Sequence, residues 1–337
     1  MKRKKTVLLV VLAFFVVSLL SLCTGQLSIP LPQVLASFSQ QLGLPFFTDV
    51  IVTPEQQAVL WYIRMPRMLV ALLVGAGLAA SGAVLQGIFS NPLADPGIIG
   101  VSSGAGVGAV LALALGFGGA GIFGLPLFAF LGAIFAVLLT VSLSMRHGRI
   151  PVMTLLLSGV VVGMLLSAVT AAILTAVDTH KLQQYLFWTI GGLDYRRWEH
   201  VYMGLLPIGS GLAIMLLLAR HLNVLVLGEN EARSVGMNVS VYRFLLLAVA
   251  SMTTAASVCI SGNIGFVGLV VPHMMRILDG PDHRRLLPLS ILAGGTFLVF
   301  CDMVGRVLLP TTEIRVGIMT ALVGTPYFLY LLRRRIL

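Results

Sequence analysis

Charged residues are scarce in this chain of 337 residues. They make up 10% of the sequence, whereas hydrophobic residues make up 58% and the mean hydropathy is +1.01. Soluble domains carry roughly 25% charged residues, so this composition excludes an ordinary soluble protein and indicates a polytopic membrane protein. With about 20 apolar residues needed per transmembrane helix, the length has room for roughly nine to eleven spans.

Lysine is rarer still, and its positions exclude one kind of nucleotide site. The only lysines are Lys2, Lys4, Lys5 and Lys181, and none of them follows a glycine. A phosphate-binding P-loop requires the sequence Gly-Lys-Ser/Thr. We therefore expect this chain not to be an enzyme and to hold neither ATP nor magnesium. If transport through it is driven by ATP, the ATPase must be another polypeptide.

Cysteine and histidine are too few and too scattered to form a metal site or a disulfide framework. Cys23, Cys259 and Cys301 are odd in number, far apart and all inside apolar segments, which is typical of small buried side chains. The six histidines show no metal-ligand spacing. For His273, which follows Pro272 in an apolar segment, we expect a hydrogen-bonded packing role instead of a ligand role.

What the sequence does contain is a series of apolar runs, and these predict an all-α protein with about ten transmembrane helices in a single domain, 1–337. The amino terminus resembles a signal peptide but lacks an Ala-x-Ala cleavage site, so we interpret it as an uncleaved first span. Two milder segments, 25–63 and 177–199, are predicted as extracytoplasmic loops, the first with room for one short helix. The predicted spans are 7–24, 64–86, 98–115, 122–145, 152–176, 200–219, 241–261, 264–278, 286–309 and 315–332.

The net charge of +10 follows from basic residues at the ends of these spans. Such residues set the orientation of a membrane protein, so no nucleic-acid partner is expected. An even number of spans places both termini on the same side of the membrane. Of the 22 basic residues, fifteen fall on that side and seven on the other. This bias predicts cytoplasmic termini and a multi-pass protein of a bacterial cytoplasmic (inner) membrane, in contact with lipid. The seven are Arg64, Arg67, Lys181, Arg196, Arg197, Arg306 and Arg315.

The stretch from Arg64 to Gly108 organises the rest of the chain. It contains an apolar run, a proline-broken turn at 91–97 and a second run with Gly100, Gly104 and Gly108 at four-residue spacing. A broken helix persists in a bilayer only where protein or a wet cavity surrounds it, and small residues one turn apart let helices pack closely. These features predict tightly packed helices around a pathway; the alternative is two ordinary spans joined by a turn. Asp95 is predicted to cap the helix that begins near Gly97.

Two further places carry charge. Glu229, Glu231 and Arg233 crowd together in the segment 220–240, where Gly228 and Gly236 bracket room for about two helical turns. A short cytoplasmic helix here would be a docking site for a soluble partner. The alternative interpretation of the segment is a solvated loop between spans. Asp302 and Arg306 lie four residues apart in an apolar span and can pair. A structural pair and a docking or pathway role for Arg306 both remain open.

Several long motifs, in this order, resemble the FecCD-type permeases, the membrane subunits of ABC importers for iron–siderophores, haem and vitamin B12. They cover nearly the whole chain. One departure is Arg315, where the family often has proline, so the last span is expected to begin differently here. The motifs are RMPR and GAGLAASGAVLQGIFSNPLADPGIIGVSSGAGVG at 64–108, LGENEARSVGMNVSVYR at 227–243, GNIGFVGLVVPHMMR at 262–276, DHRRLLP at 282–288 and EIRVGIMTALVGTPYFLYLL at 313–332.

The resemblance implies a type II ABC importer permease that pairs with a second copy, or with a paralogue, around a central pathway. It implies a cytoplasmic pair of ATPase subunits and an extracytoplasmic substrate-binding protein as partners. The positions implied for binding-protein docking are Arg64, Arg67 and Arg306, with snorkelling anchors as the alternative for the first two. ATPase coupling falls on Glu229, Glu231, Ala232, Arg233 and Gly236. The pathway and inner gate fall on Asn91, Pro92, Pro151, Val152 and Met153. The gate region is expected around Gly148 to Thr154, where a plain helix start at Pro151 is the alternative.

Three classes of function follow from these observations. The first is a permease working by alternating access, with an iron–siderophore as the first expected cargo and haem or cobalamin as alternatives. The second is an ion-coupled secondary transporter, which needs an intramembrane carboxylate such as Asp302. The third is a membrane hydrolase built on Ser102 in the G-x-S-x-G match at 100–104. That match lacks the strand, histidine and acid that the motif requires, so helix packing is the favoured interpretation.

Overall fold

The computed structural model describes residues 2–47, 49–119, 121–145, 150–309 and 311–336, and every regular element within these ranges is a helix. Each predicted span corresponds to one helix. The ten are α1 (Lys2–Cys23), α4 (Met65–Ile88), α5 (Val101–Ala114), α6 (Gly124–Ser144), α7 (Val152–Ala176), α9 (Trp198–Leu217), α12 (Val239–Ser261), α13 (Val267–Asp279), α14 (His283–Val307) and α15 (Val316–Ile336).

Seven of these helices are long and apolar enough to cross a membrane: α1, α4, α6, α7, α9, α12 and α14. α5 and α15 are shorter apolar helices in the described residues, and α13 has only 13 residues. A helix of this last length covers about 20 Å, less than the ~30 Å of a hydrocarbon core. α13 therefore needs the chain before it to complete the crossing.

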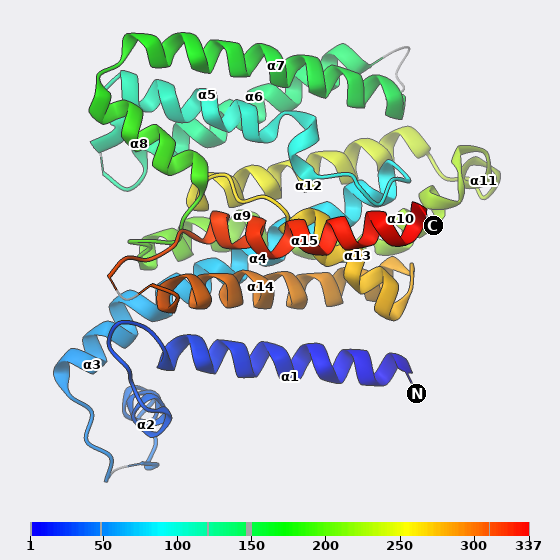
Figure 1. Cartoon of the computed structure of the whole chain (residues 1–337). Helices are drawn as coiled ribbons and strands as arrows, with labels where there is room; N and C mark the ends of the chain where they lie inside the picture. Colours follow the sequence, from blue (N-terminus) through cyan, green and yellow to red (C-terminus); the bar gives the residue numbers. More distant parts are fainter. Residues whose placement is uncertain (1, 48, 120, 146–149, 310, 337) are drawn as a thin grey trace.

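The helices lie side by side, and both termini are at the same end of the bundle, together with α11 (Glu229–Ser234) (Figure 1). α2 (Leu31–Gln41), α3 (Pro54–Ala58) and α8 (Thr179–Ile190) lie at the opposite end. The prediction that both termini share one side is therefore confirmed. Following the bias of basic residues, the end with the termini is called the inner end below and the other the outer end.

The two segments predicted as loops are more helical than expected. The segment 25–63 contains α2, α3 and the start of a π-helical stretch, Val59–Arg64, that leads into α4. A capping box begins α3, in which the Thr53 hydroxyl accepts from the backbone N–H of Gln56. The segment 177–199 contains α8, which the Asp178 carboxylate caps by accepting from the backbone N–H of Lys181 at 2.9 Å. The prediction for this segment rested on its aromatic residues, which favour the membrane interface, and it missed this helix cap.

α4 is the central helix, and it packs through glycine. In its most apolar stretch 83% of the residues are buried inside the molecule, against 22% for α7. A Cβ added at Gly75 would lie 2.3 Å from the carbonyl oxygen of Gly294 in α14, and one at Gly82 would lie 1.9 Å from that of Gly268 in α13. These helices therefore meet at backbone contact, as small residues permit.

The glycines of the Gly100–Gly108 series serve two purposes, and only one was predicted. Gly104 and Gly108 face α6, where added Cβ atoms would lie 2.3 Å and 1.9 Å from the carbonyl oxygens of Gly132 and Phe128. Gly100 instead ends the 3₁₀ turn Pro96–Ile99 with a φ of +89°. A left-handed backbone turn is what requires glycine there, and its contacts with Ala136 of α6 and Val162 of α7 are ordinary ones at 3.7 and 3.8 Å from the Cβ position.

An irregular segment inside the bundle precedes α13. The backbone N–H of Gly192 donates to the carbonyl of Ser261 at 2.8 Å, and a Cβ on Gly262 would meet the carbonyl of Trp188 at 2.3 Å. Phe266, with a φ of +68°, packs where Gly324 of α15 has no side chain. Non-helical backbone at membrane depth is tolerated where protein encloses it, and here the end of α8 and α15 do so.

Replacing Gly108 by alanine is expected to lower the stability of the protein because the added methyl group has no space against α6. Overpacking of this kind costs about 1–3 kcal/mol. The matched control is Gly209→Ala in α9, where a Cβ meets nothing within 4 Å and helix propensity favours alanine. Thermal unfolding of the full chain in detergent measures both. Equal stabilities of the two variants would contradict the close contact.

Candidate functional site

A buried arginine gathers carboxylates at the outer end of the bundle. Arg67, at the start of α4, is 8% exposed. Its Nε and Nη2 donate to Asp302 Oδ1 at 3.0 and 2.8 Å, and its Nη1 donates to Glu313 Oε2 at 2.7 Å. Asp194 Oδ1 lies 3.4 Å from Nη2. One guanidinium thus joins α4, α14 and the segments before α9 and α15.

Arg306 completes this group from the other side of Asp302. Its Nε lies 3.2 Å from Asp302 Oδ2, as the spacing of four residues predicted. Its Nη2 also donates to the hydroxyl and the carbonyl of Ser21, at 2.7 and 3.1 Å. The side chain is 6% exposed. Arg306 therefore bridges α14 and α1 as well as pairing with Asp302.

Arg64 is buried as well, and it contacts backbone instead of carboxylate. Its Nη1 donates to the carbonyl of Leu22 at 2.5 Å, and its Nη2 donates to the carbonyl of Leu27. Leu22 lies in the last turn of α1, and Leu27 lies in the connection between α1 and α2. In the single chain all three guanidiniums, of Arg64, Arg67 and Arg306, contact internal partners. Their role in docking a binding protein stays a prediction.

Arg315, the departure from the family pattern, ties the start of α15 to α8. Its Nη1 donates to the carbonyl of Phe187 at 2.9 Å, and its guanidinium lies 4.6 Å from the centre of the Phe187 ring. Its Nε is 3.9 Å from Asp194 Oδ2. α15 begins directly after it, at Val316.

At the inner end, the predicted coupling segment is a pair of short helices. α10 (Ala219–Leu227) and α11 are separated by Gly228, with a φ of +130°, and Gly236 follows α11 with a φ of +81°. Ala232 is fully buried, whereas Glu231 and Arg233 are exposed. The glycines therefore bound a helix that leaves the bundle, as their spacing suggested, at the right edge of Figure 1.

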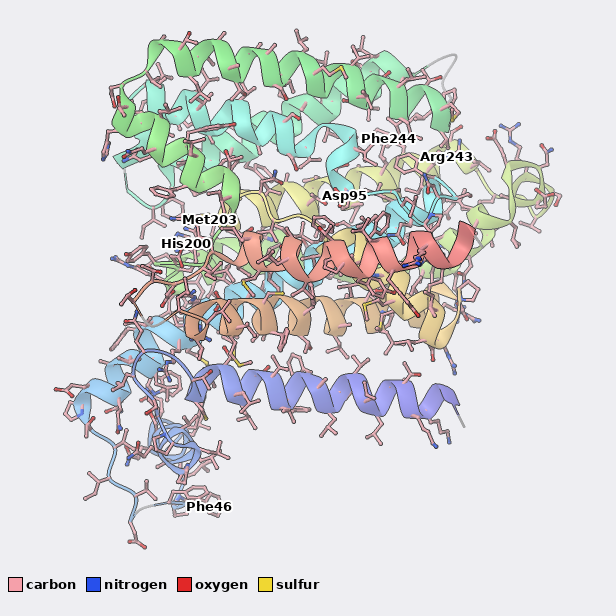
Figure 2. All side chains as sticks on the ribbon, viewed as in Figure 1. Phe46, Asp95, His200, Met203, Arg243 and Phe244 are labelled. Atoms are coloured by element: carbon pink, nitrogen blue, oxygen red, sulfur yellow. The ribbon has the colours of Figure 1, made fainter. Side chains whose placement is uncertain are left out.

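Glu229 links α11 to the helices behind it. Its carboxylate pairs with Arg233 within α11 and lies 3.4 Å from Arg243 near the start of α12. Arg243 in turn donates to the carbonyl of Ile150 at 3.1 Å, immediately before α7. Figure 2 shows Arg243 near this end of the bundle. A chain of polar contacts thus runs from α11 to the residues where the inner gate was predicted.

The predicted gate residues surround the start of α7. Pro151 is the N-cap residue of the helix, Val152 begins it and packs against the core, and Met153 is 71% exposed. Gly148, where the predicted gate region began, lies outside the described residues. The structure supports the helix start and leaves the gating role a prediction.

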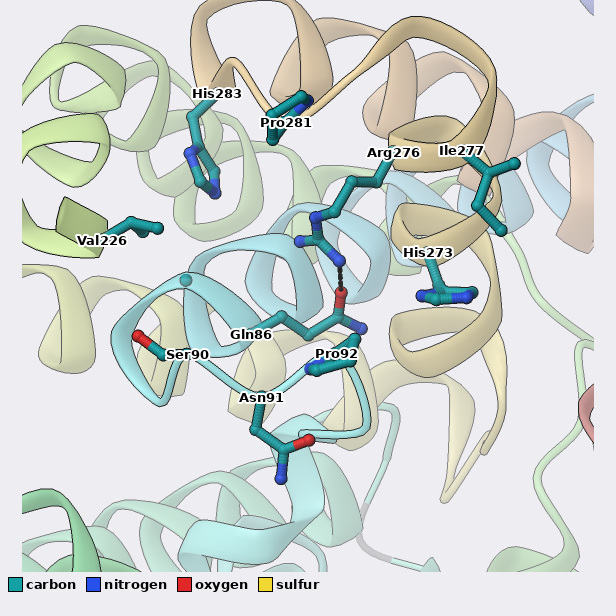
Figure 3. A pocket seen from close by; sticks show the side chains of 11 residues that line it. Gln86, Ser90, Asn91, Pro92, Val226, His273, Arg276, Ile277, Pro281 and His283 are labelled. Carbon is teal, nitrogen blue, oxygen red and sulfur yellow. Dashed lines mark hydrogen bonds between the residues drawn. The ribbon is translucent and has the colours of Figure 1, made fainter. Parts of the chain in front are cut away.

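Asn91 and Pro92 line a hollow of about 480 Å³ below α10, α13 and the start of α14 (Figure 3). Arg276 of α13 donates through Nη1 to Gln86 Oε1 at 2.8 Å, and Gln86 donates in turn to the carbonyl of Leu269 at 3.1 Å. The turn after α4 is therefore held to α13 by side chains. Asn91 and Pro92 lie at the mouth of this hollow near the inner end instead of deep within the bundle.

Two smaller predictions can be checked directly. Asp95 caps the turn at 96–99 by accepting from the backbone N–H of Gly97 at 2.7 Å, which confirms the expected cap. Ser102, of the G-x-S-x-G match, lies in α5 and donates to Asn263 Oδ1 at 3.1 Å. A serine bonded to an amide within a helix does not have the strand-to-helix turn that a nucleophile elbow requires.

Sequence reasoning missed Asp194, Glu313 and Arg276 as members of these groups. Each is a rare charge within or beside an apolar segment, which by default marks a functional or paired position. That signal was used for Asp302 and could have been applied to all three. It could not have told which charge meets which.

The comparisons with known proteins agree with this architecture. The sequence profile of the FecCD transport family matches residues 11–334. The cobalamin import system permease protein BtuC of Halobacterium salinarum is 48% identical over 295 residues, covering 88% of this chain and 76% of that protein. The vitamin B12 import system permease protein BtuC of Klebsiella pneumoniae is 36% identical over 325 residues, covering 96% and 92%. A solved metal-chelate type ABC transporter in an inward-facing conformation shares 35% identity and a TM-score of 0.86, covering 98% of this chain and 99% of its own.

Replacing Asp302 by asparagine is expected to destabilise the protein strongly, because Arg67 and Arg306 then lose a shared buried counter-charge. Removing one partner of a buried pair costs about 3–5 kcal/mol. The control is Asp178→Asn, whose side chain is 59% exposed beside Lys181. Thermal unfolding in detergent gives the stabilities, and uptake per folded protein, with and without a proton gradient, tests the ion-coupled alternative. Wild-type uptake that needs the gradient, together with a folded Asp302→Asn variant that has lost that need, would favour a secondary transporter.

Proposed function

This chain belongs to the FecCD transport family, and from that premise we propose that it carries cobalamin into the cell by alternating access. At the coarser level it is a multi-pass membrane protein and the permease component of an ABC importer. The observation that carries the finer proposal is the 48% identity with a permease named for cobalamin import, over 88% of this chain. This identity is our reason for proposing cobalamin before the iron–siderophore that the motifs alone suggested first.

A metal chelate such as an iron–siderophore is the second candidate. The solved transporter that covers 98% of this chain is described as of the metal-chelate type. Cobalamin and ferric chelates are both bulky ligands, so a wide apolar path serves either. The binding protein would select between these two ligands, so uptake must be measured with cobalamin and with a ferric siderophore.

The proposed ATPase dock is the surface of α10 and α11. Leu227 is 70% exposed and Val235 71% exposed, although both are apolar and lie beyond the spans. Glu231 and Arg233 are exposed beside them. Apolar anchors with a charged rim are the composition of a protein interface. The ATPase subunits would bind ATP and magnesium, and this chain would receive their motion through α11.

Within the chain, the proposed route of that motion is the contact between Glu229 and Arg243. Movement of α11 displaces the Glu229 carboxylate, which lies 3.4 Å from Arg243. Arg243 moves with α12 and holds the carbonyl of Ile150 before the gate residues Pro151, Val152 and Met153. Ion pairs and hydrogen bonds between helices are a contiguous path along which such a displacement can pass.

The remaining partners enter the proposal at the other surfaces. A binding protein would dock at the outer end, where Arg64, Arg67 and Arg306 become available only if their internal contacts open. A second copy of the chain would pair along α7 and α15, since 22% of the apolar stretch of α7 is buried. A hollow beside α15 that includes Thr325 and Pro326 supports this placement, because lipid gives a polar side chain no partner.

Assembly and uptake test the proposed function together. Gentle detergent extraction followed by native mass is expected to show two copies of this chain with two copies of a P-loop ATPase. Proteoliposomes made with that complex and its binding protein are expected to transport cobalamin when ATP is present on the side of the membrane that the ATPase subunits face. Uptake of a ferric siderophore in place of cobalamin would move the assignment to the second candidate. An oligomer without any ATPase would contradict both.

Replacing Glu229 by glutamine is expected to uncouple the two ends of the route, because an amide keeps the shape but loses the charge that attracts Arg243. ATP hydrolysis per molecule transported should rise several-fold while the ATPase still co-purifies. The matched control is Glu199→Gln, an exposed glutamate in the first turn of α9 at the outer end. Uptake and hydrolysis are measured in the same vesicles. Unchanged stoichiometry in Glu229→Gln would remove this residue from the route.

A further inference from the structure

A groove with an apolar wall and a charged mouth lies between α1 and α14 at the inner end. It has a volume of about 450 Å³. α1 and α14 run side by side in Figure 1 and pack directly against each other. The residues that line it are Lys4, Val7, Asp279, Arg284, Arg285, Pro288, Leu289 and Leu292.

One wall of this groove belongs to an apolar face of α1 that the rest of the chain leaves exposed. Only 17% of the apolar stretch of α1 is buried inside the molecule, and Val7, Leu8 and Leu9 are 46%, 69% and 65% exposed. The groove continues onto this apolar face at the level where the basic residues gather. Its occupant must therefore have an apolar part that lies along α1 and a polar part that reaches the charges at the end of the bundle.

Two cations at the mouth have no side-chain partner among the described residues. Lys4 and Arg285 are exposed, and neither makes an ion pair or a side-chain hydrogen bond with the residues that the structure describes. Arg284 differs, because its Nη2 lies 2.9 Å from Asp282 Oδ2. Basic pockets at the cytoplasmic ends of transmembrane helices bind lipid head groups. Lys4 and Arg285 can thus receive a phosphate.

The same groove contains an acidic side chain that a phosphate alone does not satisfy. Asp279, the last residue of α13, is 7% exposed, and its Oδ1 is buried without a hydrogen-bond partner in the described part of the chain. A carboxylate is unfavourable at a helix C-terminus, where the backbone carbonyls already concentrate negative charge. A buried polar group also costs free energy until it is hydrogen-bonded. Asp279 therefore calls for a cation with N–H donors.

We propose that this groove binds an aminophospholipid of the phosphatidylethanolamine class. Its phosphate lies against Lys4 and Arg285, its primary ammonium donates to Asp279, and an acyl chain follows Val7, Leu289 and Leu292. Phosphatidylglycerol matches the two cations but brings nothing for the carboxylate. Phosphatidylcholine brings a cation without N–H donors. Of these three lipids, only the ethanolamine one brings both a phosphate and a cation with N–H donors.

The test uses the full chain in mixed micelles with equal amounts of dioleoyl phosphatidylethanolamine, phosphatidylglycerol and phosphatidylcholine, with bound lipids counted by native mass. The wild-type chain is expected to retain the ethanolamine lipid preferentially. Asp279→Asn should weaken that lipid about tenfold relative to phosphatidylglycerol, since a charge-assisted hydrogen bond is lost. Lys4→Gln and Arg285→Gln should weaken both. Lys5→Gln, which alters an exposed lysine next to Lys4 that does not line the groove, is the matched control.

The proposal fails if wild-type protein retains phosphatidylglycerol or phosphatidylcholine as well as it retains the ethanolamine lipid. It fails equally if Asp279→Asn leaves the preference unchanged. The comparison of the three lipids on the wild-type chain stands on its own should that variant not fold. None of these outcomes depends on the cargo or on the ATPase, so they are separable from the transport experiments.

Discussion

Backbone contact at the glycines of α4 is the constraint on which the arrangement of the other helices depends. Lipid tails are as apolar as leucine, so burial of apolar surface does not bring helices together in a bilayer, and close packing must do so. Gly75 and Gly82 allow α14 and α13 to approach α4 until backbones touch. Side chains with a Cβ at these positions would separate the helices. The short α13 and the irregular segment before it could then no longer be enclosed.

At the two ends of the bundle, charged side chains connect the helices in place of glycine contacts. At the outer end Arg67, Asp302 and Arg306 connect α4, α14 and α1, and at the inner end Glu229 and Arg243 connect α11 and α12. The two sets differ in burial. Asp302 is 2% exposed, so its ion pairs are strong and costly to break, whereas Glu229 is 39% exposed and can exchange its partner for water. The outer ion pairs therefore suit a connection that stays fixed, and the inner ion pairs suit a connection that can change.

The sequence predicted the elements far better than the contacts between them. The apolar run at 152–176 coincides with α7. The pair Asp302–Arg306 follows from the rule that side chains four residues apart on a helix are neighbours. Arg67 and Asp302 are separated by 235 residues, a distance at which no spacing rule operates. No partner for Arg67 could therefore be predicted, since Asp302, Glu313 and Asp194 all come from distant parts of the chain. Periodicity shows which face of a helix is apolar, but it does not show which helix that face meets.

These constraints divide the molecule into two parts for transport. α4 contacts α9, α12, α13 and α14, whereas α5, α6 and α7 pack mainly on one another and on α12. Figure 1 shows α5 to α8 as a group along one side. α12 is the helix that belongs to both parts, and Arg243 near its start contacts both α11 and Ile150, two residues before α7. In the proposed coupling route, α12 is therefore the helix through which a displacement of α11 would reach the α5–α7 group.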